Sequence, residues 1–173
     1  MTAPLIFITG ASSGIGQALA LRFAQAGWRL ALVARRGAEL QAWVDAQGWN
    51  PAQARVYAAD VCDVRSIVDA GQSCIAELGL PDAVVANAGI SVGIDTADFG
   101  DLEVLRATFE TNNLGMAATF HPFVAAMGQR GSGRLVGIAS VAGIRGLPGH
   151  GAYCASKAAL ISYCESLRLE CAP

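Results

Sequence analysis

A chain of 173 residues can form one domain with a substantial core, and it leaves no room for two. Apolar residues make up 53% of the chain and charged residues 15%, which excludes a disordered protein. The formal net charge of −2 gives no electrostatic reason to expect nucleic acid or an anionic membrane surface as a partner.

Further patterns exclude other classes of protein. The apolar runs are short and are broken by glycine, arginine or aspartate, so we expect none of them to span a membrane. No lysine or arginine precedes the first apolar run, which leads directly into a glycine-rich turn, and we therefore expect no signal peptide. The 5 cysteines show no Cys-x-x-Cys spacing and, with the 2 histidines, form no cluster typical of a metal site. These features predict a cytoplasmic protein with reduced thiols and no metal.

Short aliphatic runs alternate along the chain with longer stretches of helical periodicity. In the first half, the expected elements in chain order are a strand at 5–8, a helix at 15–26, a strand at 30–34, a helix at 38–47 and a strand at 55–58. In the second half they are a helix at 64–78, a strand at 83–86, one long or two shorter helices at 102–127, a strand at 135–139 and a helix at 151–170. Continuous rather than alternating hydrophobicity is typical of strands covered on both faces. The sequence therefore predicts an α/β fold with a doubly wound parallel sheet, in a single domain over residues 1–173.

Small, polar or charged residues follow every expected strand. In a doubly wound sheet, ligands bind in the crevice at the carboxyl ends of the strands. The residues found there are Thr9-Gly10-Ala11-Ser12-Ser13-Gly14-Ile15-Gly16, Arg35-Arg36, Ala59-Asp60, Asn87-Ala88-Gly89 and Ser140. Core packing does not require such residues, so we interpret this edge of the sheet as a binding site.

Gly10, Gly14 and Gly16 lie between the first strand and the first helix. Glycine permits a tight turn and lets the backbone approach a pyrophosphate, while the helix start offers free N–H groups and a positive dipole end. The spacing G-x-x-x-G-x-G differs from the better-known G-x-G-x-x-G fingerprint, and glycine turns also serve plain strand–helix packing. The strand before this turn and the amphipathic helix after it favour nucleotide binding.

Arg35 and Arg36 follow the second strand, about 20 positions after the glycine turn. An acidic residue at this place holds the ribose hydroxyls of NAD, whereas arginine accommodates the 2′-phosphate of NADP. A guanidinium can grip a phosphate in bidentate fashion, and a carboxylate would repel it. A solvated arginine pair that opens a helix is the alternative interpretation. We expect NADP(H) to be preferred over NAD(H).

Tyr153 and Lys157 stand four residues apart, which places both on one face of the last helix. A free phenol has a pKa near 10 and is a poor base at neutral pH, but a neighbouring ammonium group favours the phenolate. The pair can therefore act as a general acid and base, although the spacing alone is common on ordinary helices. Ser140 can donate a hydrogen bond to a carbonyl oxygen that gains negative charge, although a serine after a strand is usually a turn or cap residue.

The combination of these motifs resembles the short-chain dehydrogenase/reductase family. The motifs are T-G-A-S-S-G-I-G at 9–16, N-A-G at 87–89, a serine thirteen residues before Tyr153, and Y-x-x-x-K at 153–157. They stand in the family's order and at its separations along essentially the whole chain. The resemblance implies a Rossmann-like fold and hydride transfer between NADP(H) and a carbonyl or alcohol substrate.

The resemblance also implies individual roles. Tyr153 would be the general acid or base, Lys157 would lower its pKa and hold the nicotinamide ribose, and Ser140 would orient the substrate carbonyl. Asn112 matches the family's helix asparagine, which supports the lysine through a water-mediated relay; Asn113 is the neighbouring candidate. The catalytic set is thus Asn112, Ser140, Tyr153 and Lys157. The expected cofactor-binding residues are Gly10, Ser12, Ser13, Gly14, Ile15, Gly16, Arg35, Arg36, Asp60, Val61, Asn87, Ala88, Gly89, Tyr153 and Lys157, with Asp60 and Val61 at the adenine ring.

Two departures from the family pattern concern Ala86 and the chain end. Ala86 replaces an asparagine that is common just before Asn87, at a structural position. In the family, the chain continues beyond the Tyr-Lys helix into a sixth strand, a substrate lid and a seventh strand. This sequence stops at Pro173, so we expect a fragment that lacks the final strands of the family fold and leaves the fifth strand as an edge.

Two other functions compete with the reductase interpretation. A non-catalytic NADP(H)-binding module would need no proton donor, so the complete Ser-Tyr-Lys-Asn set argues against it. A lyase-like or epimerase-like relative would use the same tyrosine but usually has a different glycine spacing. The loops at 91–99 and 142–151 mix glycine with apolar residues, which suits a hydrophobic small-molecule carbonyl compound. Apolar residues on more than one face of the last helix predict a homodimer or homotetramer.

Overall fold

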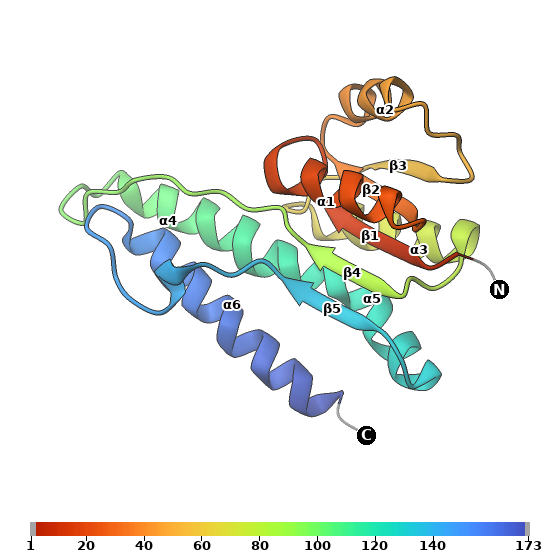
Figure 1. Ribbon diagram of the computed structural model, residues 1–173. Coiled ribbons are helices and arrows are strands. Elements are labelled where there is room, and N and C mark those ends of the chain that lie inside the picture. The colour runs from red at the N-terminus through yellow and green to blue at the C-terminus, as the bar shows by residue number, and fades with distance from the viewer. Residues whose placement is uncertain (1–2, 172–173) are drawn as a thin grey trace.

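The computed structural model describes residues 3–171 and shows one parallel sheet covered by helices on both faces (Figure 1). The strand order is β3-β2-β1-β4-β5. The strands are β1 (Leu5–Thr9), β2 (Arg29–Ala34), β3 (Ala54–Ala58), β4 (Ala83–Ala86) and β5 (Arg134–Gly137). The helices are α1 (Gly14–Gln25), α2 (Gly37–Ala46), α3 (Val64–Leu78), α4 (Asp101–Phe109), α5 (Gly115–Arg130) and α6 (Gly151–Glu170). The expected doubly wound α/β fold is confirmed.

The winding of the chain reverses at β1. From β1 the chain adds β2 and β3 on one side, and then returns to place β4 and β5 on the other. The register pairs Ile6 of β1 with Leu30 of β2 and with Ala83 of β4. The carboxyl ends of β1 and β4 therefore lie at the point where a doubly wound sheet opens a crevice.

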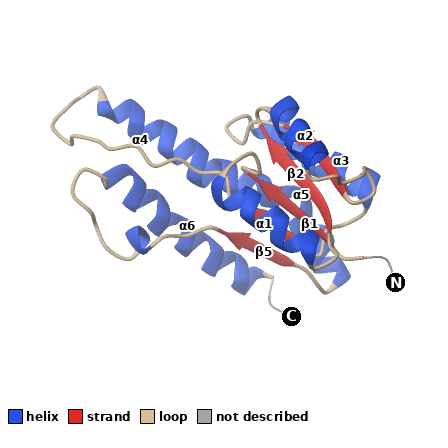
Figure 2. Ribbon diagram, turned by 45° about the horizontal axis from the view of Figure 1, so that its top comes forward, coloured by secondary structure: helices blue, strands red, loops and turns tan. Residues whose placement is uncertain are grey.

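Alternate side chains of the buried strands feed two separate cores, as the two layers of helices in Figure 2 indicate. Ile6 and Ile8 point toward α1 and α2, where they pack with residues such as Leu40. Leu5 and Phe7 point to the opposite face, where Phe123 of α5 belongs to the same cluster. Burial on both faces explains why the strands are continuously apolar.

Two expected elements differ from the structure by more than one residue at an end. The strand expected at 135–139 is Arg134–Gly137, because its partner β4 ends at Ala86, which pairs with Gly137. The helical stretch expected at 102–127 is two helices, α4 and α5, joined by one π-helical turn at Glu110–Leu114. The expected chain end at 172–173 lies outside the described residues.

Beyond the sheet, α4 and α6 run side by side, and the loops at 91–100 and 144–150 lie at their amino-terminal ends (Figure 1). Backbone hydrogen bonding joins these two loops, because the N–H of Ile94 donates to the carbonyl of Gly149 at 2.8 Å. Within residues 3–171, no helix is long and apolar enough to cross a membrane.

Candidate functional site

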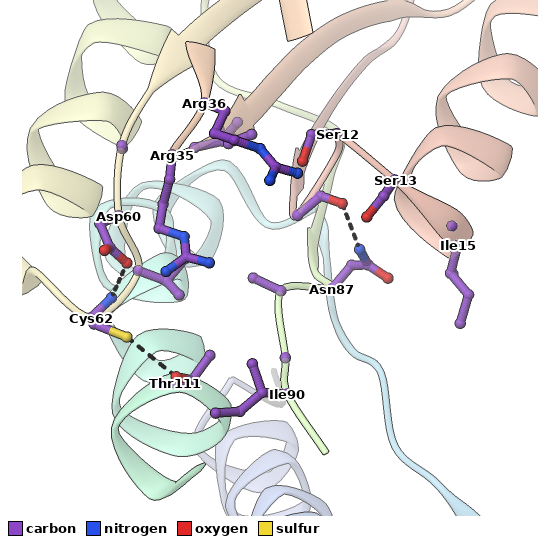
Figure 3. A pocket seen from close by; sticks show the side chains of 18 of the residues that line it. Ser12, Ser13, Ile15, Arg35, Arg36, Asp60, Cys62, Asn87, Ile90 and Thr111 are labelled. Atoms are coloured by element: carbon purple, nitrogen blue, oxygen red, sulfur yellow. Dashed lines mark hydrogen bonds between the residues drawn. The ribbon is translucent and has the colours of Figure 1, made fainter. Parts of the chain in front are cut away.

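A cleft of about 570 Å³ opens at the carboxyl ends of β1 to β4 (Figure 3). It collects most of the predicted cofactor-binding residues: Gly10, Ser12, Ser13, Gly14, Ile15, Arg35, Arg36, Asp60, Val61, Asn87, Ala88 and Gly89. Gly16, Tyr153 and Lys157, which were also predicted to bind the cofactor, do not line it. The lining also contains Ala59, expected at this edge of the sheet, and residues that the sequence analysis did not single out: Val33, Ala34, Cys62, Ile90, Ala107, Glu110 and Thr111. We refer to it as the strand-end cleft.

The glycine turn packs backbone against backbone at one wall of the cleft. Gly10 has φ 65°, and a Cβ there would lie 2.9 Å from the Cα of Ala88. Gly14 also has a positive φ, 53°, which other residues rarely adopt. A Cβ on the buried Gly16 would collide with the carbonyl group of Gly10. Gly16 therefore acts by permitting the close approach of helix and turn, without touching the cleft itself.

The amino-terminal end of α1 carries free donors at the same wall. Ser13 occupies the N-cap position, but its side chain makes no capping hydrogen bond, and no acidic residue lies in the first turn. The first N–H groups of a helix have no partner within the helix, and the helix dipole makes this end positive. This end of α1 is therefore able to receive an anion such as a phosphate.

Asn87 and Thr9 hold the ends of β4 and β1 together. The Thr9 hydroxyl oxygen accepts hydrogen bonds from the N–H groups of Asn87 at 3.1 Å and Ala88 at 3.2 Å. In return, Nδ2 of Asn87 donates to the carbonyl oxygens of Thr9 at 3.0 Å and Gly10 at 3.2 Å. The Asn87 amide thus shapes the cleft by fixing the backbone. Sequence reasoning missed the part played by Thr9, because its partners lie 78 and 79 residues away.

Arg35 and Arg36 line the cleft after β2, where Arg36 extends toward Ser12 and Arg35 lies on the side of Asp60 (Figure 3). Both are exposed at the end of β2. Nε of Arg36 forms an ion pair with the carboxylate of Glu39 at 2.8 Å, whereas no carboxylate within residues 3–171 pairs with Arg35. Of the two guanidinium groups, Arg35 is thus the one that forms no ion pair within the described residues.

Asp60 and Cys62 form the far end of the cleft. Oδ1 of Asp60 accepts a hydrogen bond from the N–H of Cys62 at 3.0 Å, so this carboxylate stabilises the turn after β3. The exposed thiol of Cys62 lies 3.2 Å from the hydroxyl of Thr111. Because the Thr111 hydroxyl donates to the carbonyl of Ala107, the thiol is the donor in this contact.

Lys157 is buried on α6 beside Tyr153. Its Nζ lies 5.6 Å from the centre of the Tyr153 ring and donates a hydrogen bond to the carbonyl oxygen of Ile138 at 2.7 Å. Burial lowers the pKa of Lys157, because desolvation penalises the charged ammonium group. A Cβ placed on Gly89 would lie 3.7 Å from this Nζ. Gly89 also lines the strand-end cleft, so the Tyr153–Lys157 pair adjoins the cleft at this residue.

Ser140 lies three residues beyond the end of β5 and caps a short 3₁₀ helix at Val141–Gly143. Its Oγ accepts a hydrogen bond from the N–H of Ala142 at 3.1 Å. Within residues 3–171, the hydroxyls of Ser140 and Tyr153 share no hydrogen bond. The hydroxyl proton of Ser140 therefore remains available to an acceptor outside the chain.

Asn112 is buried in the π-helical turn, with 1% of its surface exposed. Its Oδ1 accepts from the N–H of Ile90 at 2.8 Å, and its Nδ2 donates to the carbonyl of Ile90 at 2.9 Å. The same Nδ2 donates to Oγ of Ser156 at 2.9 Å, and Asn113 donates to the carbonyl of Ser156 at 2.8 Å. π-helical turns occur mostly as single turns within α-helices, and they are frequent at functional sites. Sequence reasoning singled out Asn112 but gave no sign of the π-helical turn or of Ser156.

Comparison with known proteins points to one family. The family model for short chain dehydrogenase matches residues 4–173. An uncharacterized oxidoreductase of Myxococcus xanthus is 40% identical over 163 residues, which cover 94% of this chain and 64% of that protein. The chain thus spans less than two thirds of the length of this relative.

Two solved structures with bound nucleotides are also similar. An alcohol dehydrogenase from the archaeon Thermococcus sibiricus, complexed with 5-hydroxy-NADP, has a TM-score of 0.87 and 28% identity, covering 98% of this chain and 72% of its own. An NAD⁺-bound xylitol dehydrogenase has a TM-score of 0.89 and 29% identity, covering 98% of this chain and 65% of its own. Similar folds therefore hold either nicotinamide dinucleotide.

Proposed function

Because the chain belongs to the short-chain dehydrogenase family, we propose that it is the cofactor-binding and catalytic part of an NADP(H)-dependent oxidoreductase. The reaction would be hydride transfer between NADP(H) and a ketone, aldehyde or alcohol. The observation that carries this proposal is the meeting of two groups of residues at Gly89. One is the strand-end cleft, with its glycine turn and arginine pair, and the other is the Tyr153–Lys157 face of α6.

The chemistry of the cleft fits a dinucleotide. The uncapped start of α1 and the glycine turn, whose Gly10 and Gly16 leave no room for a Cβ against the neighbouring backbone, offer backbone N–H groups to a pyrophosphate. Asp60 and Val61 line the cleft after β3, where we place the adenine ring. Gly89 lines the cleft beside Lys157, where the ribose next to the nicotinamide would bind.

The arginine pair supports a preference for NADP(H) over NAD(H). The second strand ends without a carboxylate that could bind the ribose hydroxyls of NAD, and two guanidinium groups stand there instead. A 2′-phosphate would bring negative charge to this end of the cleft, where Arg35 can form charge-assisted hydrogen bonds with it.

The residues of α6 would supply the proton. When bound, NADP(H) donates or accepts the hydride. Tyr153 would protonate the carbonyl oxygen during reduction, or take the proton back in the reverse direction. Lys157 uses one donor on the carbonyl of Ile138, so its remaining donors are free for a ribose hydroxyl, and its charge favours the phenolate of Tyr153. Ser140 would donate its free hydroxyl proton to the substrate oxygen, which orients the carbonyl for attack.

Exposed apolar side chains support a hydrophobic carbonyl compound as the substrate. Val141, the first residue of the 3₁₀ helix, and Ile144, just after that helix, are 75% and 81% exposed. Apolar surface of this kind beside a proton donor would bind an apolar body and leave the carbonyl to Ser140 and Tyr153.

Self-association is a second part of the proposal. Leu102 of α4 and Leu169 of α6 are 56% and 65% exposed, on helices that carry apolar residues outside the core. We propose a homodimer or homotetramer, and a monodisperse monomer in light scattering at micromolar concentration would contradict it. A cytoplasmic location stays a prediction.

Substitution Tyr153→Phe tests the proposed activity. It removes the proton donor and leaves the cleft unchanged, so we expect carbonyl reduction to fall at least about 100-fold while the Kd for NADPH changes less than about threefold. Undiminished turnover in this variant would show that Tyr153 is not the acid. NADPH binding without turnover in the unsubstituted protein would favour a non-catalytic binding module instead.

A further inference from the structure

Ser156 lies on α6 between the two proposed reactive side chains, Tyr153 and Lys157, and is completely buried. Its hydroxyl donates a hydrogen bond to the carbonyl oxygen of Tyr153 at 2.8 Å and accepts one from Nδ2 of Asn112 at 2.9 Å. The Ser156 hydroxyl oxygen thus joins the backbone of α6 at Tyr153 to the buried Asn112 of the π-helical turn. Any buried serine needs hydrogen-bond partners for its hydroxyl, but here the two partners belong to the proposed proton donor and to the π-helical turn.

Both Nδ2 hydrogens of the Asn112 amide are already used, so this side chain has no further donor with which to hold α6. Its Oδ1 and one Nδ2 hydrogen both bind the backbone of Ile90, and its second Nδ2 hydrogen binds Ser156. Asn113 binds the carbonyl oxygen of Ser156 from the same π-helical turn. The π-helical turn therefore forms hydrogen bonds with both the hydroxyl and the carbonyl oxygen of Ser156.

We propose that Ser156 is a positioning residue, whose hydroxyl locks α6 to the Asn112 amide and so sets where Tyr153 and Lys157 stand relative to the strand-end cleft. The inference rests on the proposed function, because it concerns the same proton transfer. Asn112 is anchored to Ile90, and Ile90 lines the cleft next to Gly89. The path from the cleft to the reactive helix consists of these hydrogen bonds in series.

The loss of the Ser156 hydroxyl is expected to affect alignment more than folding. Alanine is the better helix former, so Ser156→Ala leaves α6 intact. It removes the acceptor for one Asn112 hydrogen and the bond to the Tyr153 carbonyl, and α6 can then shift against the π-helical turn. Reactions that depend on near-attack geometry are sensitive to such shifts.

The test compares kcat for carbonyl reduction in three single variants of the full protein. For Ser156→Ala we expect kcat to fall on the order of 10-fold, while the Kd for NADPH stays close to that of the unsubstituted protein. The melting temperature should fall slightly, because one buried Asn112 hydrogen loses its acceptor. Ser156→Thr keeps the hydroxyl and should recover most of the loss. Ser166→Ala removes an exposed serine from the same helix and is the matched control. An unchanged kcat in Ser156→Ala would overturn the proposal.

A double-mutant cycle with Asn112→Ala separates positioning from general stabilisation. If Ser156 acts through Asn112, Ser156→Ala has no further effect on kcat once Asn112 is alanine. Independent, multiplicative losses would overturn the proposed coupling.

Lys157 offers a readout that does not need turnover. It is the one lysine in the 173-residue sequence, so lysine labelled with ¹³C at Cε gives a single signal from this chain. We expect the chemical shift of this signal, and its dependence on pH, to change in Ser156→Ala and not in Ser166→Ala. If the unsubstituted protein reduces no carbonyl with NADPH, the proposed function fails, and the Lys157 signal still decides the positioning. An identical signal in Ser156→Ala and the unsubstituted protein would refute it.

Discussion

Substitution of Arg35 by alanine probes how the chain would distinguish NADPH from NADH. The two nucleotides differ by a 2′-phosphate, which we place at the end of β2 beside Arg35. The guanidinium of Arg35 has no carboxylate partner within residues 3–171, so its full charge is available to the phosphate. Arg35→Ala should therefore weaken NADPH and leave NADH nearly unchanged.

The size of the expected loss of NADPH affinity follows from the exposure of Arg35. Two unit charges 4 Å apart interact with about 1 kcal/mol in water and about 4 kcal/mol near a protein surface. Because Arg35 is exposed, we expect a value near the lower end, about 1–2 kcal/mol, which raises the Kd for NADPH about 10-fold. Arg36→Ala should weaken NADPH binding less, because the Glu39 carboxylate at 2.8 Å already offsets the charge of Arg36.

The assay is a fluorescence or calorimetric titration with NADPH and NADH at low salt, where exposed charges are least screened. Arg22→Ala, which removes an exposed arginine from the last turn of α1, is the control for net charge. In a companion variant, Glu39→Gln, NADPH binding should strengthen about two- to fivefold, because Arg36 is released and a repelling carboxylate is lost. Equal losses of NADPH and NADH affinity in Arg35→Ala would refute the assignment of this residue to the 2′-phosphate.

Three further predictions concern the thiol, the glycine turn and the buried ammonium group. Iodoacetamide should alkylate Cys62 in the cleft more slowly when NADPH is bound, while the exposed Cys171 keeps its rate. Peptide mass spectrometry measures both rates. Alkylation of Cys62 at the same rate with and without NADPH would argue against a nucleotide there. Gly16→Ala should destabilise the fold by about 1–3 kcal/mol in denaturant unfolding, because its Cβ collides with the backbone of the preceding turn. Gly128→Ala, in open space on α5, should be neutral or slightly stabilising, and similar losses in both variants would contradict the steric argument. Lys157→Met should be at least as stable as the unsubstituted protein at pH 7, because burial lowers the pKa of Lys157 in the folded state. At a pH between the folded and the unfolded pKa of Lys157, the unfolded chain binds more protons than the folded one. The free energy of unfolding of the unsubstituted protein should therefore rise with pH relative to that of Lys157→Met. A difference between the two proteins that stays constant with pH would contradict this.

Local patterns in the sequence were sufficient to predict the sheet and most of the cleft. The strands are continuous apolar runs because both faces are buried, and the carboxyl ends of parallel strands necessarily meet at one edge. Gly10, Arg35 and Asn87 could therefore be placed together from their positions after three different strands, and the structure lines one cleft with all three.

Features that depend on contacts between distant residues could not be predicted in this way. The Thr9–Asn87 pairing spans 78 residues and the Asn112–Ser156 pairing spans 44, and neither leaves a periodic signal in the sequence. The π-helical turn at Glu110–Leu114 has the same residue types as an ordinary helix, so the pattern indicated only one long helix or two shorter ones. Ser140 was expected directly at a strand end, but β5 stops earlier because β4 offers no further partner.

The central claim, that the strand-end cleft binds NADP(H), is tested most directly by titrating the purified protein with NADPH and NADH side by side. We predict saturable binding of both, with NADPH at least about 10-fold tighter, as one additional ion pair at this exposed edge requires. Tighter binding of NADH, or no binding of either nucleotide by a folded sample, would contradict the account.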